Sequence, residues 1–267
     1  MVTVGIDVGF ESTKLVILEM DKILSRTLIR GRNDPAVSVA QKALGSAVQE
    51  AQIPLQRIRY MVVTGRGREF IPFALENIPL DKVSEPFCCA GGIYGDHPSV
   101  RTVIDIGAER TMVVGCRRGK VVRTKSNDRC AAGSGRYLRM VADLLWMDVE
   151  EMGSRALAAD KALVVENTCA VFAESEIISL IHLKEKPENI LNGVFKGLAL
   201  RIYPLLTNIG FEPDVALIGG VAKSRGMVQA LEDQIGNVII VPDDPEFIGA
   251  KGAALLAQER LERQRET

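Results

Sequence analysis

The feature that most restricts the fold of this chain is a pattern that occurs twice, about a hundred residues apart. In each copy an apolar strand ends in an Asp-x-Gly step and a second apolar strand follows: residues 6–9 precede 12–17, and residues 104–107 precede 111–114. A tight hairpin suits this step, because glycine adopts a positive φ at little cost. A third strand follows each copy after a polar turn, so we predict two antiparallel three-stranded meanders, one in each of two similar lobes.

The other segments alternate between helical and extended patterns, which predicts an α/β fold with lobes over residues 1–98 and 99–267. We expect Asp34 to cap the first helix, with Pro35 in its first turn. The last helix, from residue 245 to 259, can pack back on the first lobe. Further helices are expected over residues 68–76, 84–93, 134–145, 149–158, 169–184, 187–209 and 224–235, and further strands over residues 59–64, 215–218 and 238–241.

The composition excludes several classes of protein. Hydrophobic residues make up 47% and charged residues 25% of the 267 positions, which is typical of a globular protein with a buried core. The net charge of −1 does not favour binding to nucleic acid or to an anionic membrane surface. We expect no signal peptide, because the N-terminal residues include Asp7 and have no basic n-region. We expect no transmembrane helix, because the sequence has no run of about eighteen apolar residues. Five cysteines, an odd number, favour a cytoplasmic protein over a disulfide framework.

Asp7 and Asp105 are the candidate catalytic carboxylates. Each ends a strand in its own copy of the pattern, and we expect the two to face each other across a cleft between the lobes. Paired carboxylates beside a phosphate chain suit a hydrated Mg²⁺ ion. A plain hairpin turn explains either copy alone, but two copies at matching positions favour a site.

The residues of the two turns are candidate phosphate ligands. The backbone N–H groups and hydroxyls of Gly9, Ser12 and Thr13 can bind phosphate oxygens, and Lys14 can neutralise their charge. Gly107 occupies the equivalent turn of the second copy.

A late strand ends in Gly219-Gly220-Val221, where glycine lets the backbone approach a flat ring or a ribose. Such a turn is a weak signal alone. After two Asp-x-Gly hairpins, however, the ordered set resembles the actin, Hsp70 and sugar-kinase ATPase superfamily. That resemblance implies two ribonuclease H-like lobes of the actin-like ATPase type, a nucleotide cleft with ATP between them, and closure of the lobes as the nucleotide changes.

Cys130 and Cys169 each open a segment that has the pattern of a first helical turn. A thiolate at a helix N-terminus lies in a positive field, which suits a metal or cluster ligand. One chain offers two such positions, so a four-thiolate site requires a second chain. Each cysteine taken alone is better explained as a small buried apolar residue.

The motifs that follow these cysteines, residues 130–138 and 169–176, are more specific, and with them the chain resembles the BadF/BadG/BcrA/BcrD ATPase family over essentially its whole length. These proteins are activators of 2-hydroxyacyl-CoA dehydratases and ATPase subunits of benzoyl-CoA reductases. The resemblance implies a [4Fe–4S] cluster held across a two-fold interface by Cys130 and Cys169 of each protomer. The cofactor-binding small residues of the first motif would be Gly133, Ser134 and Gly135.

The same resemblance implies an enzyme, an ATPase coupled to electron transfer. It would accept an electron from a ferredoxin or flavodoxin and pass it, on ATP turnover, to an acyl-CoA dehydratase or a benzoyl-CoA reductase-type partner. Its cofactors would be ATP, Mg²⁺ and the shared cluster. The second chain would be another copy or a paralogous ATPase subunit, in the cytoplasm of an anaerobe.

The second Asp-x-Gly turn departs from the pattern of the family. Where dehydratase activators read Asp-Ile-Gly-Gly-Gln-Asp, this chain has Glu109 in place of a glutamine that could orient water, and Arg110 in place of the acid. The catalytic candidates are therefore Asp7, Asp105 and Glu109, and the sequence supports ATP binding more strongly than a normal rate of hydrolysis. The Asp-Ile-Gly-Ala form looks more like a benzoyl-CoA reductase ATPase subunit, which favours a heteromeric partner.

Two other functions stay open on the sequence. A small-molecule kinase of the sugar-kinase type could use Asp105 as its general base, but no sugar-binding motif is present and both helix-opening cysteines would be unexplained. The second open function is a non-catalytic, nucleotide-switched assembly protein, like relatives of actin.

Cys88, Cys89 and Cys116 are expected to be core or near-surface thiols.

Overall fold

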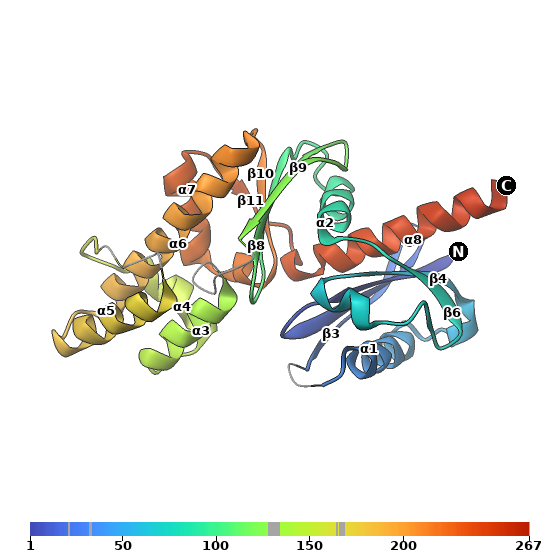
Figure 1. Ribbon diagram of the computed structural model, residues 1–267, viewed down its shortest axis with the longest axis horizontal. Helices are drawn as coiled ribbons and strands as arrows, with labels where there is room; N and C mark the ends of the chain where they lie inside the picture. The colour runs from blue at the N-terminus through green and yellow to red at the C-terminus, as the bar shows by residue number, and fades with distance from the viewer. Residues whose placement is uncertain (21, 32–33, 128–133, 164, 166–168, 267) are drawn as a thin grey trace. The chain divides into compact units, whose positions relative to one another are not determined.

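The computed structural model describes residues 1–20, 22–31, 34–127, 134–163, 165 and 169–266 (Figure 1). The chain divides into two compact units. The first unit comprises Met1–Ser99, Cys116–Val121 and Glu246–Thr267, and the second comprises Val100–Gly115 and Val122–Pro245. The C-terminal segment groups with the first unit, in line with the expectation that the last helix can pack back on the first lobe.

The first unit is built on a six-stranded sheet of order β3-β2-β1-β4-β6-β5. The central strand β1 is antiparallel to β2, which is antiparallel to β3, so the first predicted meander is confirmed. On the other side of β1, strands β4 and β6 run parallel to it and to each other. The strands are β1 (Val2–Val8), β2 (Ser12–Glu19), β3 (Lys22–Arg30), β4 (Ile58–Thr64), β5 (Ala74–Leu75) and β6 (Ile78–Lys82).

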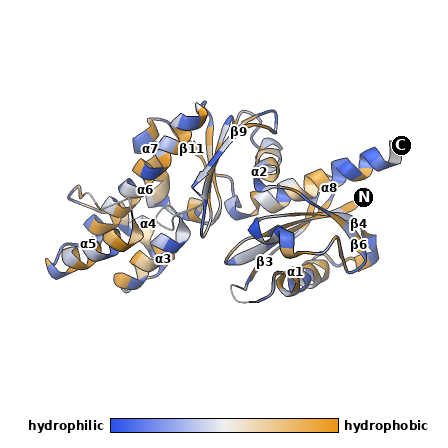
Figure 2. Ribbon diagram, viewed as in Figure 1, coloured by the Kyte–Doolittle hydropathy of each residue, from blue (hydrophilic) through white to orange (hydrophobic). Residues whose placement is uncertain are grey.

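Helices cover both faces of this sheet, which explains why β1 is buried at nearly every position. On one face, α1 (Ala36–Ala51) buries Ala40, Ala43 and Leu44 against the alternate strand residues that begin with Val2 and Val4. On the other face lie α2 (Glu85–Tyr94) and α8 (Ile248–Glu266), whose alanines pack against β2 and β4. Figure 2 shows apolar colours along the first half of α8 and hydrophilic colours toward its C-terminal end.

Glycines allow α8 to lie directly on β1 and on α2. A Cβ atom on Gly5 would stand 1.9 Å from the Ala250 carbonyl oxygen, and one on Gly252 would stand 1.7 Å from the Cys88 carbonyl oxygen. Backbones this close leave no room for a side chain. The fit between α8 and the rest of the first unit therefore depends on these two positions.

Two local predictions for the first unit were wrong. Pro35, not Asp34, is the N-cap of α1, no side chain caps the helix, and Asp34 instead accepts a hydrogen bond from Lys42 at 3.2 Å. Residues 68–76 form no continuous helix: a 3₁₀ helix, η2 (Arg66–Phe70), ends before the β5–β6 hairpin. Glu76 and Asn77 make its two-residue turn with φ of 51° and 62°, as a type I′ turn requires.

The second unit is built on a five-stranded sheet of order β11-β10-β7-β8-β9. The strands β7 and β8 are antiparallel and β9 adjoins β8, which confirms the second meander. On the other side of β7, strand β10 runs parallel to β7, and β11 runs parallel to β10. The strands are β7 (Thr102–Ile106), β8 (Thr111–Arg117), β9 (Lys120–Asn127), β10 (Val215–Ile218) and β11 (Ile239–Ile240).

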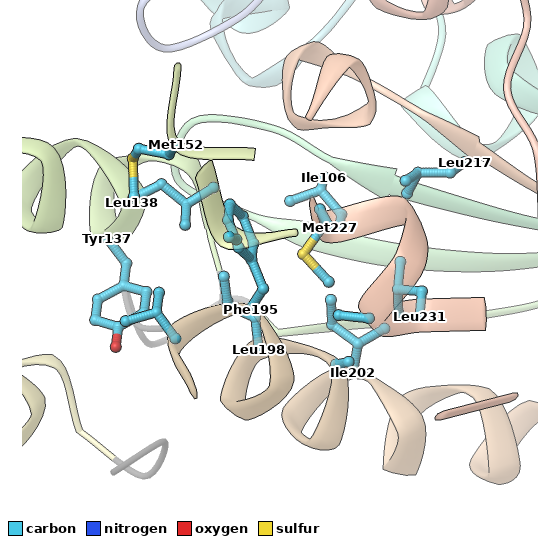
Figure 3. Close-up of a cluster of buried hydrophobic side chains, with 14 of the residues drawn as sticks. Ile106, Tyr137, Leu138, Met152, Phe195, Leu198, Ile202, Leu217, Met227 and Leu231 are labelled. Carbon is cyan, nitrogen blue, oxygen red and sulfur yellow. The ribbon is translucent and has the colours of Figure 1, made fainter. Parts of the chain in front are cut away.

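The helices of the second unit converge on one apolar core (Figure 3). The long helix α6 contributes Phe195, Leu198 and Ile202, which meet Tyr137 from α3 and Met227 from α7 in this cluster. These helices are α3 (Gly135–Leu144), α4 (Val149–Ala156), α5 (Ala170–His182), α6 (Pro187–Ile209) and α7 (Arg225–Ile235). Among the helices of the described residues, none is long and apolar enough to cross a membrane.

Replacing Gly252 with alanine tests the contact between α8 and α2. Because its Cβ would overlap the Cys88 carbonyl, we expect Gly252→Ala to lower the free energy of unfolding by about 3 kcal/mol, the upper end of the usual cost of overpacking. Gly91→Ala on α2 is the matched control, because nothing lies within 4 Å of its Cβ position and alanine favours the helix by up to about 1 kcal/mol. Urea unfolding measures both, and equal stabilities would contradict this packing.

Candidate functional site

Asp7 and Asp105 occupy equivalent places in the two sheets. Asp7 lies near the end of β1, opposite Lys14 of β2 and Thr64 of β4. Asp105 lies near the end of β7, opposite Met112 of β8 and Ile218 of β10. Each carboxylate therefore sits between an antiparallel and a parallel neighbour, at the carboxyl end of its strand, where open α/β sheets bind ligands.

A glycine on the adjacent parallel strand makes room for each carboxylate. Gly65 follows β4 with φ 88°, and a Cβ there would stand 2.6 Å from Asp7 Oδ1. Gly219 follows β10 with φ 87°, and a Cβ there would stand 2.7 Å from Asp105 Oδ1. Both glycines open a 3₁₀ helix, η2 after Gly65 and η4 (Gly220–Lys223) after Gly219. The two units thus share a second repeated element, an Asp–Gly pair.

Sequence reasoning found Gly219 and missed Gly65. The signal for Gly65 was nevertheless present, since an apolar strand runs into Thr64-Gly65-Arg66-Gly67 at the point equivalent to the Gly219 turn. The Asp-x-Gly repeat covers only the first half of each pattern and does not include Gly65. A comparison of both halves of the pattern would have identified both glycines.

The two Asp-x-Gly turns have matching hydrogen bonds. The Gly9 N–H donates to the Ser12 carbonyl at 3.1 Å, and the Gly107 N–H donates to the Arg110 carbonyl at 2.9 Å. The expectation of a positive φ at these glycines was wrong, because neither is among the residues with positive φ. Gly9 is required by close approach instead: its Cβ would stand 2.8 Å from the Ser12 carbonyl oxygen.

The first turn places a cation beside the backbone of Gly9. The Lys14 Nζ atom lies 3.5 Å from the Cβ position of Gly9, so the amine is held beside this turn. Thr13 is buried and Ser12 half-buried on the same strand. Gly249, in the first turn of α8, lies against the same site, with its Cβ position 3.5 Å from Asp7 Oδ2. The N-terminal end of α8 therefore approaches the Asp7 carboxylate, a residue pairing that the sequence did not indicate.

In the second unit the Asp-x-Gly turn is tied to the start of α3. Gly135 N–H donates to the Gly107 carbonyl and Arg136 N–H donates to the Ala108 carbonyl, both at 2.9 Å. The Arg136 guanidinium donates to Glu109 Oε1 at 2.7 Å. Ser134, the fully buried N-cap residue of α3, directly precedes this pair of bonds.

Val221 joins this group. Its Cγ2 atom lies 3.4 Å from the Cβ position of Gly135, which is also 3.4 Å from the Gly107 carbonyl oxygen. Four predicted site residues, Gly107, Glu109, Gly135 and Val221, are therefore neighbours within the second unit.

A pocket of about 480 Å³ opens next to the Gly219–Val221 turn. This volume is within the range of small-molecule sites. Its wall combines apolar side chains with a few charged and amide groups, and none of these residues was predicted from the sequence. The lining residues are Leu157, Ala222, Lys223, Arg225, Val228, Gln229, Glu232, Val241, Pro242, Asp243 and Pro245.

Cys169 is the N-cap residue of α5, as the sequence predicted for a helix-opening cysteine. Its carbonyl accepts a hydrogen bond from Ala173 N–H at 3.0 Å, and the residue is half-buried. The thiol therefore stands at the positive end of a helix of 13 residues with access to solvent, as a cluster ligand requires. The other predicted ligand, Cys130, and the neighbouring Gly133 lie outside the described residues.

The segment that leads to Cys169 is anchored on α6. The buried amide of Asn189 accepts hydrogen bonds from the N–H groups of Asp160 and Lys161, at 3.0 and 3.2 Å. One turn later, Gly193 admits Val165, whose Cγ2 atom lies 2.9 Å from the Cβ position of the glycine. These contacts fix the chain up to four residues before the cysteine.

Cys88, Cys89 and Cys116 are buried, which confirms that they are core thiols. Burial raises the pKa of the Cys88 thiol to about 12, so this thiol is protonated at neutral pH. Cys169 thus differs from these three in its access to solvent.

Alanine at Gly65 or Gly219 should displace the carboxylate beside it. We expect either substitution to weaken binding of an ATP analogue at least about tenfold, because the new Cβ would overlap Asp7 or Asp105. Gly236→Ala is the control: φ is 73° there too, but nothing lies within 4 Å of its Cβ position. It should lower the free energy of unfolding by about 1 kcal/mol and leave affinity unchanged. Isothermal titration calorimetry on folded variants measures the affinity for the ATP analogue. Unchanged affinity in both site variants would refute the Asp–Gly assignment.

Comparison with known proteins matches this architecture to a family. The BadF/BadG/BcrA/BcrD ATPase family matches residues 4–257. A 2-hydroxyisocaproyl-CoA dehydratase activator of Clostridioides difficile is 37% identical over 272 residues, covering 100% of this chain and 98% of the relative. One of the subunits of the benzoyl-CoA reductase of Thauera aromatica is 32% identical over 274 residues, covering 98% of this chain and 95% of the relative.

Solved structures agree with the sequence comparison. The activator of the 2-hydroxyisocaproyl-CoA dehydratase from Clostridium difficile with bound ADPNP superposes with a TM-score of 0.91 at 35% identity, covering 100% of this chain and 98% of that one. A ROK family glucokinase from Streptomyces griseus, at 14% identity and a TM-score of 0.62 over 97% of this chain and all of the other, shares the fold alone. The predicted actin-like ATPase fold is confirmed, and the chain belongs to the BadF/BadG/BcrA/BcrD ATPase family.

Proposed function

We propose that this protein is an ATP-dependent activator that passes a low-potential electron to a 2-hydroxyacyl-CoA dehydratase or a benzoyl-CoA reductase-type partner. The observation that carries the proposal is the presence, in one chain of this family, of two Asp–Gly pairs and an accessible thiol at a helix N-terminus. The first feature suits a nucleotide machine and the second a cluster ligand. A sugar kinase requires only the first, so we do not favour that function.

The Asp–Gly pairs fit a magnesium–nucleotide complex. Glycine keeps a side chain out of the space beside each carboxylate, so Asp7 and Asp105 can hold the water shell of a Mg²⁺ ion, which would neutralise phosphate charge. Gly9, Ser12, Thr13 and Lys14 would bind phosphate oxygens in the first unit, and Gly107 in the second. The adenosine would contact Gly219, Gly220 and Val221 and enter the adjacent pocket.

Glu109 is the proposed catalytic group for hydrolysis. Its carboxylate, held by Arg136 at 2.7 Å, keeps a free oxygen lone pair that can accept a proton or orient a water molecule. Arg136 acts through Glu109, as a positioning residue. The replacement of glutamine by glutamate at this position changes the charge facing the phosphates but keeps a hydrogen-bond acceptor.

Cys130 and Cys169 of each protomer would hold a [4Fe–4S] cluster, a group that supplies one-electron chemistry. Cys169 is the N-cap residue of α5, so the N-terminal end of this helix would face the cluster. Gly133, Ser134 and Gly135 would leave room around the cluster. The second protomer is another copy or a paralogous ATPase subunit, and the Asp-Ile-Gly-Ala turn favours the paralogue.

The backbone provides a route from the nucleotide to the cluster ligand. The Gly107 and Ala108 carbonyls accept hydrogen bonds from the first residues of α3, Gly135 and Arg136. Cys130 precedes Ser134, the N-cap of α3, by four positions in the sequence. A displacement of the Asp-x-Gly turn on nucleotide exchange would therefore move the start of α3 and the segment that carries Cys130.

The remaining partners follow from the chemistry. A low-potential electron requires a reduced donor, which we propose to be a ferredoxin or flavodoxin, and an oxygen-free cytoplasm. The acyl-CoA would be bound by the dehydratase or reductase component rather than by this chain.

Cysteine substitutions test the cluster. Anaerobically purified protein should contain about four irons and four acid-labile sulfides per dimer, and Cys130→Ser or Cys169→Ser should lose them. Cys89→Ala is the control and should keep the iron, because Cys89 is buried in the first unit. Iron and sulfide analysis measures this content, and an iron-free, colourless wild-type protein would refute the proposal.

Substitutions of Asp7 and Glu109 separate the binding of ATP from its hydrolysis. Asp7→Ala should abolish ATP turnover, since the Mg²⁺ complex loses a carboxylate. Glu109→Ala should lower kcat about 100-fold or more with little change in KM for ATP, the usual effect of losing a general base. Steady-state phosphate release measures both. Full activity in Asp7→Ala would refute the assigned site, and full activity in Glu109→Ala would remove Glu109 from the mechanism.

A further inference from the structure

The β8–β9 hairpin carries a concentration of positive charge that the nucleotide and cluster sites do not use. Residues 111–127 contain five lysines and arginines and no aspartate or glutamate, in a chain whose net charge is −1. The five cations are Arg117, Arg118, Lys120, Arg123 and Lys125.

This charge lies on an exposed edge. Strand β9 is the last strand of its sheet, and most of its residues are exposed, including Val122 at 57%. Hydrophilic colours mark much of the strand in Figure 2, in contrast to the apolar strands at the centre of the sheet. Lysines on edge strands commonly prevent edge-to-edge aggregation, so a few charges here need no further explanation.

The equivalent strand of the first unit shows that the repeat alone does not require this surface. Strand β3 is also an edge strand, but α1 packs on it and buries Ser25 and Thr27. Its hairpin also contains acids, among them Glu19, which pairs with Arg57. The acid-free hairpin is therefore a property of the second meander, although its turn at Gly119 packs against Tyr94 of α2.

Two of the five cations have partners within the chain. Arg123 donates to the Ile209 carbonyl at 3.2 Å and so satisfies the C-terminal end of α6, and Arg117 also interacts within the protein. Arg118, Lys120 and Lys125 are exposed, and no ion pair joins them to another described residue. These three side chains can therefore bind an external anion.

We propose that the β8–β9 hairpin is the docking surface for an acidic electron-donor protein of the ferredoxin or flavodoxin type, an inference that rests on the proposed function. Charge complementarity selects an acidic partner and accelerates its encounter. In the sequence, Asn127 at the end of β9 precedes the proposed ligand Cys130 by three positions, which an extended chain spans in at most about 11 Å. A donor bound here brings its redox centre toward the cluster. One electron would leave the donor, which would be oxidised, and would reduce the cluster that Cys130 and Cys169 are proposed to hold.

Charge reversal on the hairpin tests the docking surface. The variant Arg118→Glu/Lys120→Glu/Lys125→Glu should bind a reduced acidic ferredoxin with two [4Fe–4S] clusters about tenfold or more weakly at low ionic strength. Its rate of reduction by this ferredoxin should fall by a similar factor, and the dependence of that rate on salt should flatten. Lys22→Glu, on the exposed start of β3, is the matched control and should behave as wild type.

Biolayer interferometry measures the affinity, and anaerobic stopped-flow absorbance measures the reduction. Titanium(III) citrate, a small reductant, should reduce the wild-type and variant clusters alike. Iron-loaded variant protein with unchanged ferredoxin affinity and rate would overturn the docking surface and leave the proposed function standing. Wild-type protein without iron would overturn the proposed function first, before any docking is measured.

Discussion

The close approach of each candidate carboxylate, Asp7 and Asp105, to a glycine of the neighbouring parallel strand is the constraint on which the rest of the proposed site depends. Any Cβ at Gly65 or Gly219 would overlap both a carboxylate oxygen and a backbone carbonyl. The chain accepts a φ near 90° at both positions, a conformation that only glycine adopts readily. That the same solution occurs in each unit indicates that the space beside Asp7 and Asp105 is needed for a ligand.

A second constraint connects that space to the chemistry proposed for the cysteines. In the second unit, the Asp-x-Gly turn and the N-terminus of α3 share backbone hydrogen bonds, and Arg136 adds an ion pair to Glu109. The turn and the helix can therefore move only together. Asp160, Lys161 and Val165, which precede Cys169 in the chain, instead contact Asn189 and Gly193 on α6. One ligand would thus follow the nucleotide while the other rests on the core, which would change the surroundings of a cluster held by both.

Sequence reasoning succeeded where the signal is local. The repeated Asp-x-Gly steps predicted both meanders, and the strand that ends at Gly219 predicted its turn. Both signals, apolar strand patterns and glycines at turns, depend only on a few neighbouring residues. The cysteine at the start of α5 was found for the same reason. A resemblance to a family then supplied the function, which the local patterns alone left open.

Prediction failed where tertiary contacts or an unusual backbone conformation determine the local structure. The β5–β6 hairpin uses Glu76 and Asn77 at positive φ, although glycine is the usual signal for such a turn. The approach of Gly249 to Asp7 depends on the packing of α8 some 240 residues away along the chain, which no local pattern reports.

The central claim is that the nucleotide state controls the environment of a cluster. The most direct measurement is the rate at which an iron chelator such as bathophenanthroline disulfonate removes iron from anaerobically purified protein, with and without MgATP. The account predicts a several-fold difference between the two rates, and a loss of that difference in Asp7→Ala. Identical rates in wild-type protein that binds ATP and contains iron would contradict it.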